Sequence, residues 1–265
     1  MIFLKKPLII LTGPTAVGKT KLSISLAQAV NGAIISADSM QVYRHMDIGS
    51  AKIRPEEMCG VPHYLIDVLD PSEEFHVVKF VELAHEAMEK IYAAGQIPIV
   101  TGGTGFYIQA LLKEVDFTES HGELPIRKEL EEKAATVYGA AELYQKLSEV
   151  DPASAETIHP NNVKRVIRAL EYYYETGQKI SEHNEEQKQK ESPYCSAYFV
   201  LNDERSILYD RIDRRVDQMI CDGLVDEVFR LKEMGYTRDL VSMQGLGYKE
   251  LFPYLAGECT LEEAV

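Results

Sequence analysis

Two glycines, a lysine and a threonine near the N-terminus have the spacing of a phosphate-binding loop. The motif Gly13-x-x-x-x-Gly18-Lys19-Thr20 follows an apolar run and precedes a segment of helical periodicity, which is the setting that the motif requires. Glycines let backbone N–H groups turn toward an anion, and the positive end of the following helix points at the same place. Lys19 adds a mobile positive charge, and the Thr20 hydroxyl can ligate Mg²⁺. This nucleotide-binding, ATP-type motif predicts that a diphosphate or triphosphate is bound by Gly13, Pro14, Thr15, Ala16, Val17, Gly18, Lys19 and Thr20.

A carboxylate follows the second apolar run of the chain. Asp38 comes just after the predicted strand 33–36, and in an open sheet of parallel strands ligands bind beyond the carboxyl ends of the strands. Asp38 is therefore expected at the same sheet edge as the phosphate-binding loop. There it can hold Mg²⁺, directly or through water, or accept a proton from an incoming nucleophile. Capping of a local turn is the structural alternative.

Three arginines lie close together on a helix predicted after the last strand. They could offset negative charge that builds on a leaving phosphate group. Aspartates alternate with them, so a solvated helix face of mixed charge is an equally available interpretation. The arginines are Arg211, Arg214 and Arg215, and the aspartates are Asp210, Asp213 and Asp217.

These residues predict a Mg²⁺-dependent enzyme that transfers a group from a phosphorylated donor. A GTPase is disfavoured because the sequence has no Asn-Lys-x-Asp motif for reading the base. A small-molecule kinase remains open on the residues alone.

Short apolar runs alternate with amphipathic helical segments, a pattern typical of a parallel α/β sheet. The runs predict strands at 8–12, 33–36, 64–68, 97–101 and 198–201, with helices between them and a last helix near Leu261. From 113 to 193 charged helical segments replace the strands. We therefore expect a P-loop NTPase-like core of parallel sheet and flanking helices, residues 1–112 and 194–265, with an inserted all-helical subdomain, 113–193.

Composition limits the possible partners and location. The net charge of −14 over 265 residues argues against a broad nucleic-acid surface, which is normally basic. No apolar run is long enough to span a bilayer, so no membrane partner is expected. The first strand begins so early that no secretory signal fits before it, and we expect a cytoplasmic protein. The cysteines, Cys59, Cys195, Cys221 and Cys259, are far apart, which favours reduced thiols.

Several stretches, in order over nearly the whole chain, resemble the bacterial tRNA dimethylallyltransferase family. A phosphate-binding loop alone would be unspecific, whereas the ordered series is highly specific. Members usually continue past the point where this sequence ends. The stretches are GPTAVGKT (13–20), SADSMQVY (36–43), DIGSAK (47–52), PHYLID (62–67), GGTGFY (102–107), IHPNN (158–162) and GLGY (245–248).

The resemblance implies transfer of a dimethylallyl group from dimethylallyl diphosphate to N6 of adenosine 37, next to the anticodon of tRNA. The phosphate-binding loop would then hold the diphosphate of the donor, with Mg²⁺, and pyrophosphate would leave after attack on the allylic carbon. The implied partners are the anticodon stem-loop of tRNA and the donor, and a monomer is expected. The alternatives are an adenylate isopentenyltransferase, a P-loop small-molecule kinase and an RNA-binding module with a degenerate nucleotide site.

The resemblance also assigns roles to residues of this sequence. Asp38 matches the general base, and Lys19, Thr20 and Arg215 match groups at the diphosphate end, Thr20 on the metal side. Local basic residues of the inserted helices would meet the anticodon arm despite the acidic chain, since RNA is largely read through loop bases and stacking. The implied tRNA contacts are Asp38, Ser39, Met40, Gln41, Thr104, Arg127, Asn162, Val163, Lys164, Arg165 and Val166.

Overall fold

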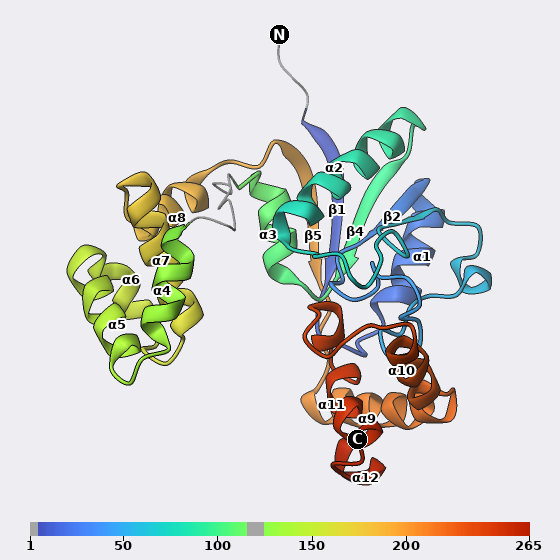
Figure 1. Ribbon diagram of the computed structural model, residues 1–265. Helices are drawn as coiled ribbons and strands as arrows, with labels where there is room; N and C mark the ends of the chain where they lie inside the picture. Colours follow the sequence, from blue (N-terminus) through green and yellow to red (C-terminus); the bar gives the residue numbers. More distant parts are fainter. Residues whose placement is uncertain (1–4, 116–124) are drawn as a thin grey trace. The chain divides into compact units, whose positions relative to one another are not determined.

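The computed structural model describes residues 5–115 and 125–265 (Figure 1). It divides into two compact units, residues 1–112 with 193–265 and residues 113–192. The first contains a sheet and its flanking helices, and the second is helical in the part that the structure describes. Throughout the described ranges, every helix is too short or too polar to cross a bilayer.

A five-stranded parallel sheet organises the first unit, as the alternating apolar runs predict. The strands lie in the order β3-β2-β4-β1-β5. In this register Thr12 pairs with Gly102, and Ser36 pairs with Thr101. The carboxyl ends of three neighbouring strands therefore meet at one edge. The bounds are β1 Lys6–Thr12, β2 Gly32–Ser36, β3 His63–Tyr64, β4 Ile97–Gly102 and β5 Tyr194–Val200.

Helices cover both faces of the sheet, and strand alternation decides which side chain meets which helix. Leu8 and Ile10 of β1 point into the larger core with α2 (Val77–Ala93) and α3 (Gly105–Lys113). Ile9, between them, faces the smaller cluster against α1 (Lys19–Val30). Successive residues of a strand point to opposite faces, so an apolar run without polar breaks fits a sheet buried on both sides.

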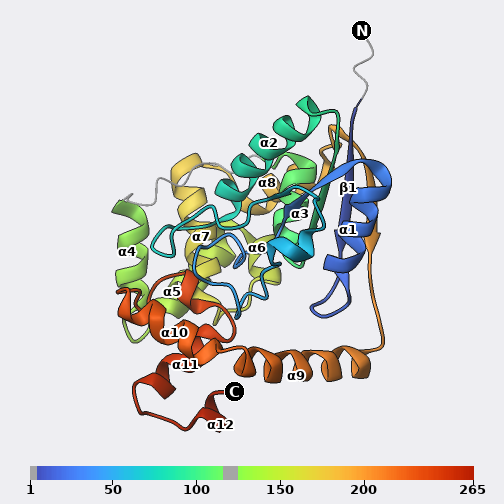
Figure 2. The same ribbon diagram turned by 90° about the vertical axis from the view of Figure 1, so that its right-hand side faces the viewer.

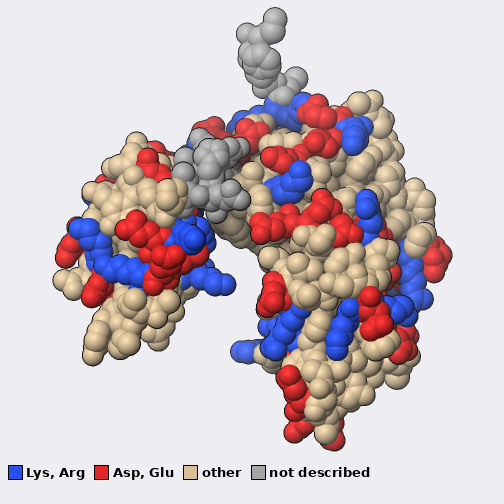
Figure 3. Space-filling view, in the orientation of Figure 1, with Lys and Arg blue, Asp and Glu red and all other residues tan. Residues whose placement is uncertain are grey.

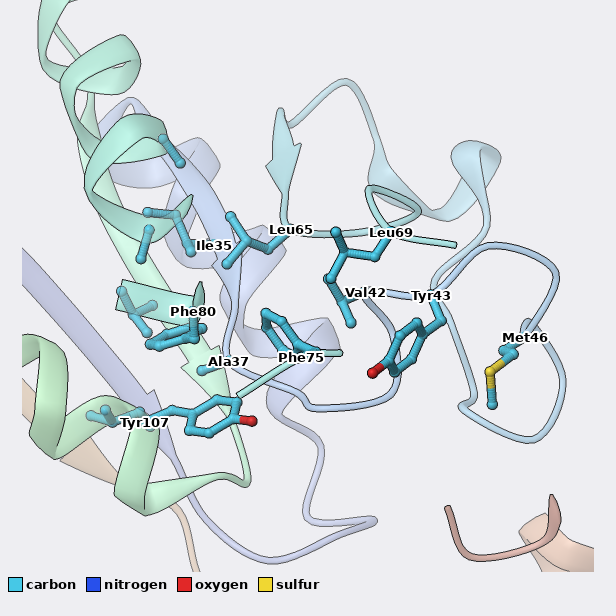
Figure 4. Packing of buried hydrophobic residues seen from close by; sticks show 14 of the residues in the cluster. Ile35, Ala37, Val42, Tyr43, Met46, Leu65, Leu69, Phe75, Phe80 and Tyr107 are labelled. Carbon is cyan, nitrogen blue, oxygen red and sulfur yellow. The ribbon is translucent and has the colours of Figure 1, made fainter. Parts of the chain in front are cut away.

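Aromatic rings extend the larger core from the sheet to the loop that follows β2 (Figure 4). Phe80 stacks on Tyr107 with centroids 4.9 Å apart, and Phe75 meets Tyr107 edge-on at 5.6 Å. Tyr43, on that loop, contacts Phe75 at 6.4 Å. Such pairs add about 0.5–1.5 kcal/mol each beyond burial, so the chain after Asp38 is packed against the core.

The C-terminal helices lie at the carboxyl ends of the strands, and Figure 2 shows α9 as a long rod beneath the sheet. A short 3-10 turn at Ser242–Gln244 precedes α11, and another, at Pro55–Met58, lies in the loop after β2. The helices are α9 Arg205–Cys221, α10 Leu224–Glu233, α11 Tyr248–Leu255 and α12 Leu261–Ala264.

The helical unit has its own core, in which Leu147 and Leu170 are fully buried. Asp151 is 1% exposed and caps α6, accepting hydrogen bonds from Ser154 and from Ser181 at the start of α8. The described helices of this unit are α4 Pro125–Ala134, α5 Gly139–Val150, α6 Pro152–Thr157, α7 Val163–Thr176 and α8 Ile180–Gln189.

Two strand predictions differ from the structure. The run 64–68 predicts a strand, but β3 ends at Tyr64 because Leu65 and Asp67 take positive φ values of 62° and 56°. The last strand is longer than the predicted 198–201 and is not buried. It lies at the sheet edge beside β1, and Phe199 is 52% exposed.

Three helices have details that the sequence pattern does not reveal. On α1, Leu22 is 43% exposed, whereas Ala27 is buried. The N-cap residue of α9 is Glu204, whose side chain makes no capping hydrogen bond. Helix α11 is not among the predicted helices, and it contains Pro253, a residue type that disfavours helix interiors.

Candidate active site

The phosphate-binding loop forms between β1 and α1. Gly13 and Gly18 have φ values of 148° and 95°, a region that side chains rarely allow, so the glycines are needed where the motif has them. The Lys19 ammonium donates to the carbonyl oxygens of Gly13 at 2.9 Å and Pro14 at 2.7 Å. An ammonium has three donor hydrogens, so one remains for an anion at the start of α1.

Asp38 makes a tight turn just beyond β2. Its Oδ1 accepts the backbone N–H of Met40 at 2.8 Å and of Gln41 at 3.4 Å. The capping interpretation is therefore correct for one carboxylate oxygen. Both bonds go to Oδ1, so the turn itself leaves Oδ2 available for chemistry.

Two cations lie within electrostatic reach of this carboxylate. Burial lowers the pKa of Lys19, while Asp38 opposes that shift and Arg215 adds to it. Burial also lowers the pKa of Arg215, and Asp38 again opposes the shift. A carboxylate favours the charged form of a nearby cation, and a second cation disfavours it. The three side chains, from α1, the loop after β2 and α9, thus converge on one region.

A cavity of about 60 Å³ lies between Lys19 and Asp38 at the carboxyl edge of the sheet. Lys19, Thr20 and Asp38 line it together with Thr101, and three isoleucines supply apolar wall. The Thr101 Oγ1 is buried with no hydrogen-bond partner among the described residues. The isoleucines are Ile34, Ile53 and Ile66.

His63, which the motifs do not single out, also lines this cavity. Its Nδ1–H donates to the carbonyl oxygen of Val61 at 2.8 Å, which leaves Nε2 as an acceptor in the neutral ring. Burial lowers the pKa of His63. His63 reaches the cavity because β3 pairs with β2. A strand of two residues leaves almost no pattern in the sequence from which this pairing could be predicted.

The glycine turn at the end of β4, residues 102–105, packs against the backbone of Ala37, next to Asp38. A Cβ on Gly102 would lie 2.2 Å from the carbonyl oxygen of Ala37, so only glycine fits there. The N–H of Thr104 donates to the same oxygen at 3.3 Å. Gly103 has nothing within 4 Å of an added Cβ. Packing therefore explains the first glycine, and Thr104 lies beside the Asp38 segment.

The arginines of α9 play different parts. Arg211 pairs with Asp203 at 2.9 Å and donates to the Ala16 carbonyl at 3.5 Å, so it braces the phosphate-binding loop. Arg215 is partly buried and faces Lys19 and Asp38, whereas Arg214 is exposed. The solvated-face interpretation therefore fits one of the three.

The residues that the family resemblance links to tRNA in the helical unit differ in accessibility. Asn162 caps α7, and Lys164 and Arg165 in its first turn are exposed, whereas Val166 is 1% exposed. Figure 3 shows Lys and Arg mixed with Asp and Glu on the visible face of each unit. Basic charge is thus local, as expected for an acidic chain.

Arg127 is held by carboxylates. Its guanidinium pairs with Glu131 at 3.1 Å and with Glu171 at 3.1 Å. Glu171 is fully buried and also pairs with Arg168 at 2.9 Å. These ion pairs within the helical unit therefore neutralise part of the positive charge that Arg127 could offer to tRNA.

The chain matches one protein family. The model of the family described as IPP transferase matches residues 41–265. A tRNA dimethylallyltransferase of Lachnoclostridium phytofermentans is 65% identical over 98% of this chain and 83% of its own length. One of a Thermoanaerobacter species is 48% identical over 97% of this chain and 82% of its length.

Solved structures agree with these relatives. The tRNA isopentenylpyrophosphate transferase of Bacillus halodurans is 48% identical, with a TM-score of 0.70 over 98% of this chain and 80% of that one. A eukaryotic dimethylallyltransferase, described in crystallographic snapshots as acting on tRNA, is 35% identical, with a TM-score of 0.84 over 98% of this chain and 65% of that one.

Proposed function

The chain belongs to the IPP transferase family, and from this premise we propose that it transfers a dimethylallyl group from dimethylallyl diphosphate to N6 of adenosine 37 in tRNA. The observation that supports this most is that Lys19 and Asp38 line one cavity beside the phosphate-binding loop, with Arg215 within electrostatic reach of both. An anion site and a base within reach of each other suit a transfer in which diphosphate leaves as an amine attacks.

The diphosphate end of the donor would bind at the loop between β1 and α1. The N–H groups at the start of α1 and the ammonium of Lys19 supply donors and positive charge. Arg215 approaches from α9 on the other side. As the allylic carbon–oxygen bond breaks, negative charge grows on the leaving diphosphate, and both cations stabilise it in a partly desolvated place.

The acceptor amine would lie at Asp38. The N6 nitrogen forms the new bond to the allylic carbon, the diphosphate leaves with the electron pair of the broken bond, and Oδ2 takes the proton from nitrogen. The Oδ1 atom stays bonded to the turn. Holding the base rigidly matters because proton transfer needs hydrogen-bond reach.

Mg²⁺ is proposed to accompany the diphosphate. The Thr20 hydroxyl and, through water, the Asp38 carboxylate would hold it; both line the same cavity. In phosphate sites Mg²⁺ takes one or two protein oxygen ligands, several waters and phosphate oxygens, so this donor set fits. When bound, the ion would neutralise part of the diphosphate charge.

The helical unit, 113–192 in the structure, is proposed to contact the anticodon stem-loop. The exposed Lys164 and Arg165 at the start of α7 support this, because a helix N-terminus with added cations suits phosphate groups. A monomer also stays a prediction, which light scattering on the purified protein would test.

Undermodified tRNA, labelled dimethylallyl diphosphate and Mg²⁺ should yield labelled tRNA and pyrophosphate. AMP offered in competition separates this reaction from that of an adenylate isopentenyltransferase, and ATP with candidate acceptors tests for a kinase. The relatives are named tRNA dimethylallyltransferases, which favours tRNA as the acceptor over AMP and over a kinase reaction. Label that stays in the donor with tRNA present would refute the proposal.

A further inference from the structure

A buried carboxylate on α10 is surrounded by hydrogen-bond donors from the loop after β2. Glu227 is 2% exposed. Its Oε2 accepts the backbone N–H of Asp47 at 3.0 Å and of Ile48 at 2.8 Å, and its Oε1 accepts that of Gly49 at 3.1 Å. The hydroxyl of Tyr248, on α11, donates to Oε1 at 2.7 Å. All four contacting groups donate a hydrogen bond, which suits an ionised carboxylate, because it can only accept.

Hydrogen bonds lead from this turn to the catalytic segment. The turn closes through Ala51 N–H, which donates to the Ile48 carbonyl at 2.9 Å. The carbonyl oxygens of Ser50 and Ala51, at the end of this turn, accept from the Gln41 side-chain amide at 3.4 and 3.5 Å. The Gln41 backbone N–H in turn donates to Asp38 Oδ1. Glu227 and the proposed base are thus linked by a short series of hydrogen bonds.

A second contact joins the same two regions. A Cβ on Gly245, in the turn before α11, would lie 2.5 Å from Cε of Met40, so that turn rests against the Asp38 segment. Tyr248, the first residue of α11, follows this turn and is fully buried. The C-terminal helices therefore hold the loop after β2 at both Met40 and the 47–49 turn.

We infer that Glu227 is a positioning residue for the transfer reaction: by holding the 47–49 turn it fixes Gln41 and so places Asp38 opposite the phosphate-binding loop. This inference rests on the proposed function. The path runs through the loop after β2 and does not include β1 or α1, which bind the donor. Loss of Glu227 should therefore slow the chemical step without weakening donor binding.

The test compares Glu227→Gln with the parent and with Asp151→Asn. The amide of Gln keeps the shape but places donor hydrogens against donor N–H groups. Asp151 is an equally buried, donor-surrounded carboxylate in the helical unit, so its variant controls for loss of stability alone. Assays are run well below the melting temperature of each variant, with folding checked by circular dichroism.

We expect Glu227→Gln to lower kcat at least tenfold with the KM for dimethylallyl diphosphate unchanged within twofold. Asp151→Asn should keep kcat even where its melting temperature falls as far. Tyr248→Phe, which removes one donor of four, should lower kcat about threefold and decides the matter if Glu227→Gln does not fold. Parent-like kcat in the variants, or an equal loss in Asp151→Asn, would overturn the inference.

Amide hydrogen exchange separates this inference from the proposed function, because it needs no activity. In Glu227→Gln the amides of 47–49 and those of Met40 and Gln41 should exchange at least tenfold faster than in the parent. Faster exchange at 47–49 alone would break the proposed link to Asp38. A parent without prenyl transfer would refute the function while leaving the exchange result readable.

Discussion

Replacing Asp38 by asparagine separates the two tasks of this carboxylate. Oδ1 accepts two backbone N–H groups, and an asparagine Oδ1 accepts them equally well. Oδ2 is replaced by an amide nitrogen that cannot take a proton. The fold should therefore persist while the base is lost. Loss of a general base lowers turnover by about 10²–10⁴-fold, which corresponds to roughly 3–5 kcal/mol in the activation barrier.

The donor should still bind to the Asp38→Asn variant. Lys19 and Arg215 remain, and the negative charge beside them that would repel a diphosphate is removed, so donor affinity should be largely kept. Single-turnover transfer of labelled dimethylallyl to tRNA measures the chemical step, and equilibrium dialysis measures donor affinity. Asp38→Ala is the matched variant, because it also loses the turn, at a cost of about 0.5–2 kcal/mol in stability. Turnover of Asp38→Asn within threefold of the parent would return Asp38 to a purely capping role.

Three further outcomes follow from the described contacts. Lys164→Ala with Arg165→Ala should weaken tRNA binding and make its salt dependence shallower, by a slope of about 1.4–1.8 if both side chains meet phosphates; a slope equal to that of a Lys146→Ala, Lys188→Ala control would remove them from the interface. Gly102→Ala should lower turnover at least tenfold, because its Cβ would displace the Ala37 carbonyl next to Asp38, whereas Gly103→Ala should be close to the parent; similar rates in the two variants would contradict this packing argument. Burial lowers the pKa of His63 in the folded state, so the unfolded chain binds its proton first as pH falls from about 6.5, and stability should drop through that window down to the lowered pKa. His63→Gln should flatten this part of the melting temperature curve, and an unchanged curve would assign the pH dependence elsewhere.

The parallel sheet and the phosphate-binding loop are predictable from the sequence because both depend on local patterns. An unbroken apolar run indicates a strand buried on both faces, and the glycine spacing dictates the turn after β1. The edge strand β5 has the same apolar character but lies at one side of the sheet, so Phe199 is exposed. Burial at that position depends on neighbours far along the chain, which periodicity does not encode.

The site residues divide in the same way. Lys19 and Asp38 follow strands directly, so the sheet rule places them at one edge. The inward orientation of Arg215 can be predicted only when the path of α9 is known. A helix on which arginines and aspartates alternate does not itself indicate which arginine faces the site. Glu227 is harder still, since an acidic residue on an amphipathic helix normally indicates solvent. Three of its four partners are the backbone N–H groups of residues 47–49, which lie 178 to 180 positions away in the sequence. Backbone donors carry no sequence signature, so such a carboxylate emerges only once the loop and the helix are seen together. On the inference drawn above, the position of Asp38 depends on the C-terminal helices as well as on its own strand.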